Sequence, residues 1–413
     1  MRIVQGHAAE RAVRRLQQRG SRLEEVELTV KKITRAVRRD GDKALRRYAT
    51  MWDGLGKGQP LRISDHEIEA AWNEIPEALR SALREAAGNI RRFCRWQLPR
   101  EWRKKIDGGE LGQLVRPLGS VGCYVPGGRY PLPSTVLMTA IPAQVAGVKR
   151  VVVVSPRPQA ATLAAAALLG ISEVYRCGGA QAIAALAHGT ESIARVDKIV
   201  GPGNAFVTAA KKLVSSDCAI DMLAGPTEAL IYSDEGTPEF VASDIVAQAE
   251  HDPDAVVVCI TTRLTRAEQI KEAVLKQVTS NQIAREAIRR NGYILLANSR
   301  EVAMQWVNRI ASEHLTIAES DLSAVENAGS VFVGDYSPQS GGDYAAGPNH
   351  VLPTAGAARF RGGLSVYDFV KVITVQRFDR KGLQRLAPVI TTLAEAEGLR
   401  AHAQSVRVRC ASA

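Results

Sequence analysis

The stretch RVVVVSP at residues 150–156 decides the fold class of this chain. Four consecutive valines predict a strand buried on both faces, because a strand with one wet face alternates apolar and polar residues. An alanine-rich apolar helix is predicted directly after it, at residues 160–169. A buried strand followed by a helix is the repeating unit of a parallel sheet covered on both sides.

The same alternation continues on both sides of this stretch. It predicts one Rossmann-like unit over residues 124–232, with further strands at 173–177 and 197–200 and helices at 135–146, 180–187 and 205–213. A second unit is predicted from strands at 230–232, 255–261, 292–297 and 330–334, with a helix around Gln248 and another at 265–278. Long amphipathic helices are expected at 22–50, with a break at 40–42, and at 64–105. Charge-rich, mostly helical sequence follows residue 366.

Composition excludes several classes of protein. The net charge of +11 comes largely from Arg and Lys at helical spacing among acidic and apolar residues, without a nucleic-acid-binding motif, so no nucleic-acid partner is expected. The six cysteines form no CxxC pair, which is typical of a reducing compartment. The first residues lack the apolar core of a signal peptide, and no apolar stretch reaches the length of a membrane span. We therefore expect a cytoplasmic protein that does not associate with membranes.

Three glycine-containing loops follow predicted strands, at 125–128, 177–181 and 201–204. Ligands of open parallel sheets bind beyond the carboxyl ends of the strands, where glycine lets the backbone approach a phosphate. No GxGxxG motif is present, and each loop taken singly is also compatible with a tight turn. The succession of three such loops favours a nucleotide site.

Gln248 and His251 lie three residues apart in a predicted helix, and therefore on one face of it. With Asp343 and His402 they supply oxygen and nitrogen ligands of the kind that suit zinc or manganese. The pair alone also occurs on helices that bind no metal. The sequence thus offers a candidate metal site without thiolates.

Two further segments contain acid–base groups. Glu313 and His314 are adjacent in SEHL, and a carboxylate and an imidazole can activate water and move a proton. The loop GGDYAAGPNHVLPT at 341–354 is a candidate wall of a site. A solvated dipeptide and a solvated loop are the alternatives. Thr227 and Glu228, in AGPTE, are compatible with a simple turn.

Taken together, these motifs resemble the histidinol dehydrogenase family from about residue 25 to 410. The resemblance rests on YVPGG, CGGAQAIAAL, VDKIVGPGN, AGPTE, QAEHDP, EHL, DYAAGPNHVLPT and the final EGLxAH, all in the family's order. It implies two Rossmann-like domains in an aldehyde-dehydrogenase-like arrangement, with a helical N-terminal segment and a C-terminal dimerisation tail. The implied boundaries are an N-terminal arm at 1–20, a metal-binding and catalytic domain at 21–123 and 233–365, an NAD-binding domain at 124–232, and a tail at 366–413 that crosses to the partner of a homodimer.

Site residues follow from the resemblance position by position. The implied zinc ligands are Gln248, His251, Asp343 and His402, the implied catalytic pair is Glu313 and His314, and the implied NAD⁺ contacts are Tyr124, Gln181 and Asn204. The implied substrate contacts are Thr227, His350 and Glu397, together with the metal ligands and His314. Thr227 stands where the family commonly has Ser, Ser312 where it usually has Pro, and Thr316 where Glu is frequent.

The implied reaction is the oxidation of L-histidinol to L-histidine through L-histidinal, with two NAD⁺ reduced and Zn²⁺, or Mn²⁺, as a template for the substrate. A zinc hydrolase that uses Glu313 is an alternative, but it would not need the nucleotide loops. A dehydrogenase of another amino alcohol is a second alternative. A non-catalytic binding protein is a third, and it would have no need of both Glu313 and His314.

Overall fold

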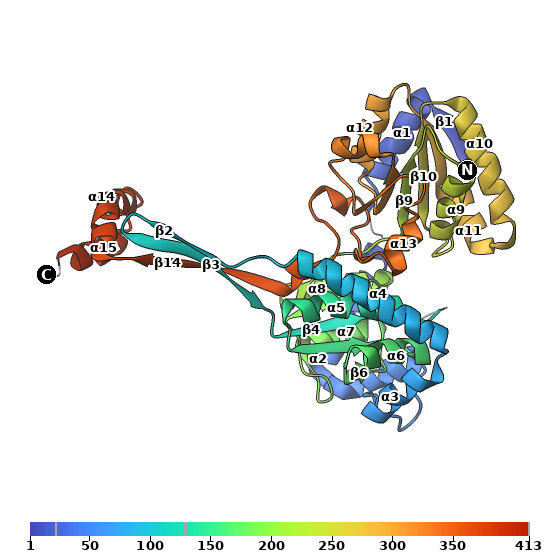
Figure 1. The fold of residues 1–413 in the computed structure, drawn as a ribbon. Helices are drawn as coiled ribbons and strands as arrows, with labels where there is room; N and C mark the ends of the chain where they lie inside the picture. Colours follow the sequence, from blue (N-terminus) through green and yellow to red (C-terminus); the bar gives the residue numbers. More distant parts are fainter. Residues whose placement is uncertain (21–22, 128–129, 412–413) are drawn as a thin grey trace.

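The structure is a computed structural model that describes residues 1–20, 23–127 and 130–411. Two parallel sheets, each covered by helices on both faces, form two globular units (Figure 1). A three-stranded antiparallel sheet leaves these units as a long arm with two helices at its end. The two predicted Rossmann-like units are therefore confirmed. Among the described residues, no helix is long and apolar enough to cross a membrane.

The first unit is built on a six-stranded sheet in the order β1-β11-β10-β9-β12-β13, with all pairs parallel. Its strands are β1 (Arg2–Gln5), β9 (Glu228–Tyr232), β10 (Val256–Thr261), β11 (Gly292–Leu296), β12 (His314–Ile317) and β13 (Ser330–Val333). Its helices are α1 (Gly6–Gln17), α9 (Pro238–Ala249), α10 (Leu264–Gln277), α11 (Gln282–Asn291), α12 (Arg300–Ile310) and α13 (Gln339–Tyr344). One face packs against α1 and α12, and the other against α9, α10 and α11.

The second unit is built on a five-stranded parallel sheet in the order β6-β5-β4-β7-β8. Its strands are β4 (Ser120–Tyr124), β5 (Arg150–Val154), β6 (Glu173–Tyr175), β7 (Lys198–Val200) and β8 (Ala219–Ile220). Its helices are α2 (Glu24–Trp52), α3 (Asp65–Glu74), α4 (Glu77–Trp96), α5 (Pro133–Ala146), α6 (Ala160–Leu168), α7 (Gly179–His188) and α8 (Ala205–Val214). Apolar residues of α3 to α6 cover one face, and those of α2, α7 and α8 cover the other. The predicted break in α2 is confirmed, because Gly41 has φ +53° inside it.

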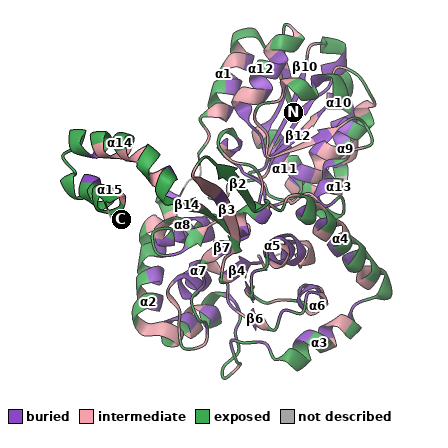
Figure 2. Cartoon of the chain, turned by 60° about the vertical axis from the view of Figure 1, so that its left-hand side comes forward, coloured by how far each residue is buried: buried purple, intermediate pink, exposed green. Residues whose placement is uncertain are grey.

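The arm contains strands from two distant parts of the chain. Its elements are β2 (Trp102–Ile106), β3 (Gly109–Pro117), β14 (Val370–Phe378), α14 (Arg380–Ala396) and α15 (Arg400–Ala411). Asp107 and Gly108 form the two-residue turn between β2 and β3, where Gly108 has φ +75° and a Cβ would lie 2.2 Å from the Cα of Gly382. Figure 2 shows the arm largely exposed, whereas the strands of both parallel sheets are buried. The arm therefore has little contact with its own globular units.

Four short 3₁₀ helices complete the described elements: η1 (Val278–Ser280), η2 (Glu319–Ala324), η3 (Ala357–Arg359) and η4 (Val366–Phe369).

The predicted domain boundaries need correction. Residues 1–20 are not a separate arm, because β1 pairs with β11 and α1 packs against α12. Residues 24–96 belong with the five-stranded sheet, since the apolar faces of α2, α3 and α4 pack there. Residues 228–232, placed in the NAD-binding domain, form the strand between β10 and β12 of the other sheet. The tail predicted at 366–413 begins with the short helix η4 and continues as strand β14, and the hairpin at 102–117 pairs with that strand.

Candidate active site

The predicted acid–base pair lies at the amino-terminal edge of the six-stranded sheet. Glu313 directly precedes β12 and His314 is its first residue, and β12 pairs with β9 so that Glu313 lies beside Glu228. The carboxyl edge of the five-stranded sheet lies near this site, because Thr135 at the start of α5 is 3.5 Å from His350 (Oγ1 to Nε2). The two units thus meet at opposite edges of their sheets, with the acid–base pair between them.

Both side chains of this pair are buried and have defined partners. The main-chain N–H of Glu228 donates to Oε2 of Glu313 at 2.9 Å. His314 lies 3.3 Å from the Glu228 carbonyl through Nδ1 and 3.1 Å from Oδ1 of Asp343 through Nε2. Both of these partners can accept a hydrogen bond, so they favour the protonated ring, in which both nitrogens donate. Glu313 Oε2 and His314 Nδ1 are 3.7 Å apart, so the two neighbours in sequence face each other.

Burial and charge shift both pKa values upward. Removal from water favours the neutral form of a carboxyl group, and it raises the pKa of Glu313 to about 8 against the opposing effect of His314. Burial also lowers the pKa of His314, but the neighbouring Glu313 and Asp343 carboxylates outweigh it and raise that pKa to about 9. The two groups are therefore coupled, because an ionised Glu313 raises the pKa of His314 and a protonated His314 opposes the rise of the pKa of Glu313.

Two of the four predicted metal ligands are in contact, and a third, His251, follows the same helix. Gln248 near the end of α9 donates through Nε2 to Oδ2 of Asp343 at 2.9 Å. His251 follows α9 and is close enough to His350 that, after the larger effect of burial, its charge helps to lower the pKa of His350. Amide, imidazole and carboxylate groups are suitable ligands for zinc or manganese.

The fourth predicted ligand does not join them within one chain. His402 is exposed on α15, at the end of the arm, and Glu397 is exposed just after α14. Figure 1 shows this end of the arm far from α9 and α13. Within the described residues, no three His, Cys, Asp or Glu side chains are placed to hold a metal ion. The residues of one chain therefore offer part of a candidate donor set.

The two other predicted substrate contacts lie beside the acid–base pair. Thr227 directly precedes β9 and is partly exposed next to Glu228. His350 approaches the carbonyl of Asp343 through Nδ1 at 2.7 Å. Both residues therefore lie within the region between the two sheets.

The predicted cofactor residues lie at or beyond the carboxyl ends of three strands: Tyr124 ends β4, Gln181 lies in the first turn of α7 after β6, and Asn204 precedes α8 after β7. The hydroxyl of Tyr124 accepts from the N–H of Gly179 at 3.2 Å, and the buried Gln181 donates through Nε2 to Asp53 at 3.0 Å. Asn204 is exposed and caps α8 by accepting from the N–H of Val207. Tyr124 and Gln181 thus hold two loops together, and Asn204 with the start of α8 is open to a ligand. Gly128 of the first glycine loop lies outside the described residues.

Two supports of these loops were not expected from the sequence. Asp53 accepts from the N–H of Gly178 and from Gln181, and burial raises its pKa. The buried Lys211 donates to the carbonyl of Gly201 and pairs with Asp221. Gly201 has φ +113°, and a Cβ there would lie 2.1 Å from the carbonyl oxygen of Tyr124, so only glycine fits. No local motif marks either residue: the partners of Asp53 lie more than 120 residues away, and those of Lys211 lie ten residues away on either side.

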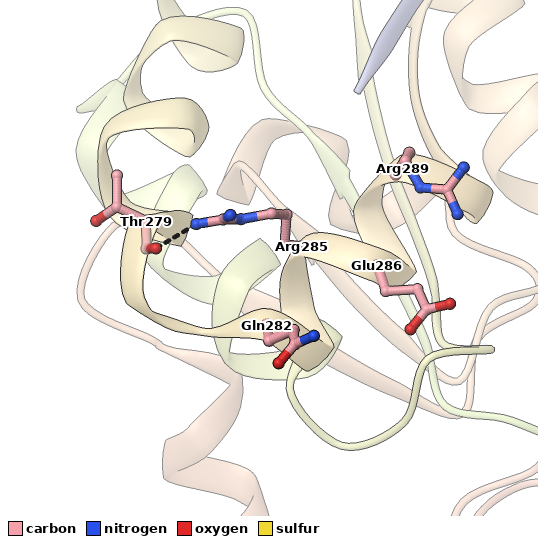
Figure 3. A pocket seen from close by; sticks show the side chains of 5 residues that line it. All are labelled: Thr279, Gln282, Arg285, Glu286 and Arg289. Carbon is pink, nitrogen blue, oxygen red and sulfur yellow. Dashed lines mark hydrogen bonds between the residues drawn. The ribbon is translucent and has the colours of Figure 1, made fainter.

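A separate cavity lies on the surface of the six-stranded unit. A cavity of about 400 Å³ at α11 is lined by Thr279, Gln282, Arg285, Glu286 and Arg289, and Arg285 donates to the carbonyl of Thr279 (Figure 3). None of the predicted site residues lines it. It therefore does not belong to the site between the sheets.

Two parallel-sheet units with a buried acid–base pair between them define a two-domain α/β enzyme. The model of the family described as histidinol dehydrogenase matches residues 16–410, and the chain belongs to this family. It is 49% identical over 387 residues to histidinol dehydrogenase of Methanothermobacter thermautotrophicus, with 90% of this chain and 91% of the relative covered. It is 48% identical over 404 residues to that of Natronomonas pharaonis, with 95% of each chain covered. The crystal structure of histidinol dehydrogenase from Elizabethkingia anophelis is similar, with a TM-score of 0.94 and 37% identity over 99% of this chain and 98% of that chain.

Proposed function

We propose that this chain oxidises L-histidinol to L-histidine through L-histidinal, consuming two NAD⁺ and one water and releasing two NADH. Family membership supports the substrate class. The single observation that carries the chemistry is the buried contact between Glu313 and His314, because it gives one site both a water-activating carboxyl group and a proton acceptor. Two successive oxidations at one carbon need both.

His314 is the proposed base of both oxidations. Its ring is fixed by the Glu228 carbonyl and by Asp343, so only its proton has to move. In the first step, deprotonated His314 would take the proton of the substrate hydroxyl as the carbon loses a hydride, for which bound NAD⁺ would supply the acceptor. In the second, it takes a hydroxyl proton from the aldehyde hydrate. The raised pKa of His314, about 9, means that the base form is scarce at neutral pH.

Glu313 is the proposed activator of water between these oxidations. As a carboxylate it removes a proton from water as the oxygen attacks the aldehyde, and the hydrate results. Its Oε2 is anchored by the N–H of Glu228, which keeps the carboxyl group beside His314. Because the site is buried, the aldehyde is shielded from bulk water until this step.

Zinc, or manganese, is the proposed metal, held by Gln248, His251, Asp343 and His402 of the partner subunit. When bound, it orients the imidazole and amine of the substrate as a template. The incomplete ligand set within one chain and the exposed arm support a homodimer in which the tail, including Glu397, completes the site of the other subunit. Tyr124, Gln181 and Asn204 are the proposed NAD⁺ contacts.

A turnover assay tests the proposed function. The purified protein with Zn²⁺ is supplied with NAD⁺ and, separately, L-histidinol, L-histidinal and other amino alcohols, and NADH is followed by absorbance. We expect turnover with L-histidinol and two NADH for each L-histidine formed. Absence of NADH with L-histidinol, together with turnover of another amino alcohol, would assign a different substrate.

A further inference from the structure

Arg19 contacts the segments that carry the acid–base pair. It follows α1, and its guanidinium is largely buried, with 13% of the side chain exposed. Nε and Nη2 contact the two carboxylate oxygens of Glu228, a side chain only 4% exposed. Such a two-pronged contact fixes the relative orientation of both groups. Arg19 therefore ties the N-terminal segment to the start of β9.

The same guanidinium contacts the turn that leads into Glu313. Nη1 donates to the carbonyl of Ile310 at 2.9 Å, and Nη2 donates to the carbonyl of Ala311 at 3.4 Å. Ala311 ends α12 with φ +51°, in the left-handed region that residues with a Cβ seldom adopt. Hydrogen bonds from a buried cation hold this turn in that conformation.

Glu228 connects Arg19 to both reacting side chains. Its N–H donates to Glu313 and its carbonyl faces Nδ1 of His314, while its carboxylate also accepts from the N–H of Ala355 at 2.8 Å. A shift of the Glu228 main chain would therefore change the partners of both groups at once. The Glu228 charge also lies close enough to Glu313 to contribute to the rise of its pKa, and Arg19 is the cation that balances it.

We propose that Arg19 is a positioning residue of the active site, which holds the Glu228 segment and the turn before Glu313 in the arrangement that gives both acid–base side chains their hydrogen bonds. The inference rests on the proposed function. It assigns a role to the N-terminal segment in catalysis, although Arg19 itself touches neither Glu313 nor His314 in the described contacts.

A matched control lies on the same pair of helices. Glu10 of α1 pairs with Arg309 of α12, and this pair is about one-third exposed on both sides. It joins the N-terminal segment to α12 as Arg19 does, but its contacts do not include Glu228. A variant at Glu10 therefore loosens the same junction without disturbing the acid–base pair.

The test compares kcat, KM for L-histidinol and thermal unfolding for the wild type, R19Q, R19K and E10Q, at a temperature where each protein is folded. We expect R19Q to lower kcat by about 10²-fold while KM changes by less than about threefold, because misplacement affects the reacting groups more than binding. R19K keeps the positive charge but loses the two-pronged contact of the guanidinium with Glu228, so its kcat should lie between those of R19Q and the wild type. E10Q should keep kcat within about twofold of the wild type.

Two results would overturn the inference. One is a wild-type kcat in folded R19Q. Where R19Q does not fold, a wild-type kcat in R19K has the same meaning. The other is an equal loss of kcat in E10Q, which would show general loosening of the junction. An active wild type with an unaffected Arg19 variant contradicts only this inference, whereas an inactive wild type contradicts the proposed function as well.

Discussion

Gln248 Nε2 lies 2.9 Å from Asp343 Oδ2, and this contact joins the end of α9 to α13 across 95 residues of sequence. Asp343 is also the partner of His314 Nε2 at 3.1 Å. The proposed metal ligands and the proposed base therefore share one carboxylate. Binding of a cation at Asp343 and the protonation of His314 must depend on each other, because both place positive charge beside the same group.

Removal of the metal should abolish turnover but leave the protein folded. None of the proposed metal ligands belongs to the four apolar clusters of the two units. The elements that carry the ligands contribute only other residues to these clusters. Chelator-treated protein should keep its circular dichroism spectrum and regain activity with Zn²⁺ or Mn²⁺. H251A should lower the bound zinc measured by elemental analysis. Full turnover by protein shown to be metal-free would refute the metal site.

Substitution of Glu313 should separate the two oxidations. E313Q keeps the shape of the side chain and its acceptor oxygen for the N–H of Glu228, but it cannot take a proton from water. We expect oxidation of L-histidinal to fall far more than oxidation of L-histidinol, measured with each substrate in turn. Equal losses in both steps would show that Glu313 does not act as the activator of water.

Substitution of His314 should slow both oxidations. H314Q loses the base at each step, and rates should fall by about 10²–10⁴-fold, the usual contribution of a general base. Phe332 stacks on the ring, with 5.9 Å between centroids, so F332L serves as a control that alters packing and keeps the base. A loss in F332L as large as that in H314Q would indicate a packing role for His314.

The rate should rise with pH. Both proposed bases act only when deprotonated, and their pKa values are raised to about 8 for Glu313 and about 9 for His314. The rate constant kcat should therefore increase from neutral to alkaline pH and level off once both groups have lost their protons. The measurement is kcat at saturating substrates over a series of buffers in which the enzyme stays folded. A rate that is flat or falls over this range would contradict the assigned roles.

Asp53 should matter for the cofactor. D53A removes the acceptor of the Gly178 N–H and of Gln181, and an unpaired buried donor costs about 1–3 kcal/mol. KM for NAD⁺ should rise by about fivefold or more, because about 1 kcal/mol, the lower end of that range, corresponds to a fivefold change. D53N keeps an acceptor oxygen and should resemble the wild type. An equal rise of KM for NAD⁺ in D53N, or no rise in D53A, would show that the hydrogen bonds of Asp53 do not support cofactor binding.

The local sequence pattern predicts the two parallel sheets, but it does not predict which strands belong to each sheet. The run at 150–154 and the strand around Cys259 are apolar and short, and both are buried parallel strands. β1 contains only four residues, and it pairs with a strand 291 positions away in the sequence. The sequence around Gly108 predicts the end of a helical region. In the structure it forms a hairpin, and the pairing with β14 makes this hairpin part of the arm.

Within the site, motifs identified reacting groups better than their supports. The sequence motifs predict Glu313, His314, Gln248 and Asp343, and the structure brings these four residues together. No motif predicts Arg19, because an arginine in a basic helical segment has the same pattern whether it faces solvent or a buried carboxylate. Burial and partner are properties of the tertiary structure, and they are what distinguish Arg19 from its exposed neighbour Arg14.

Each active site of the proposed homodimer contains the acid–base pair of one chain and the tail of the other. A mixed dimer of H402A and E313Q subunits tests this arrangement most directly, after each variant alone is shown to be nearly inactive. If the tail crosses, both lesions fall in one site and the other is intact, so the mixed dimer should recover about half of the wild-type activity by the symmetry of a two-fold dimer. No recovery in a verified mixed dimer would contradict this arrangement, because it would mean that each site is built from a single chain.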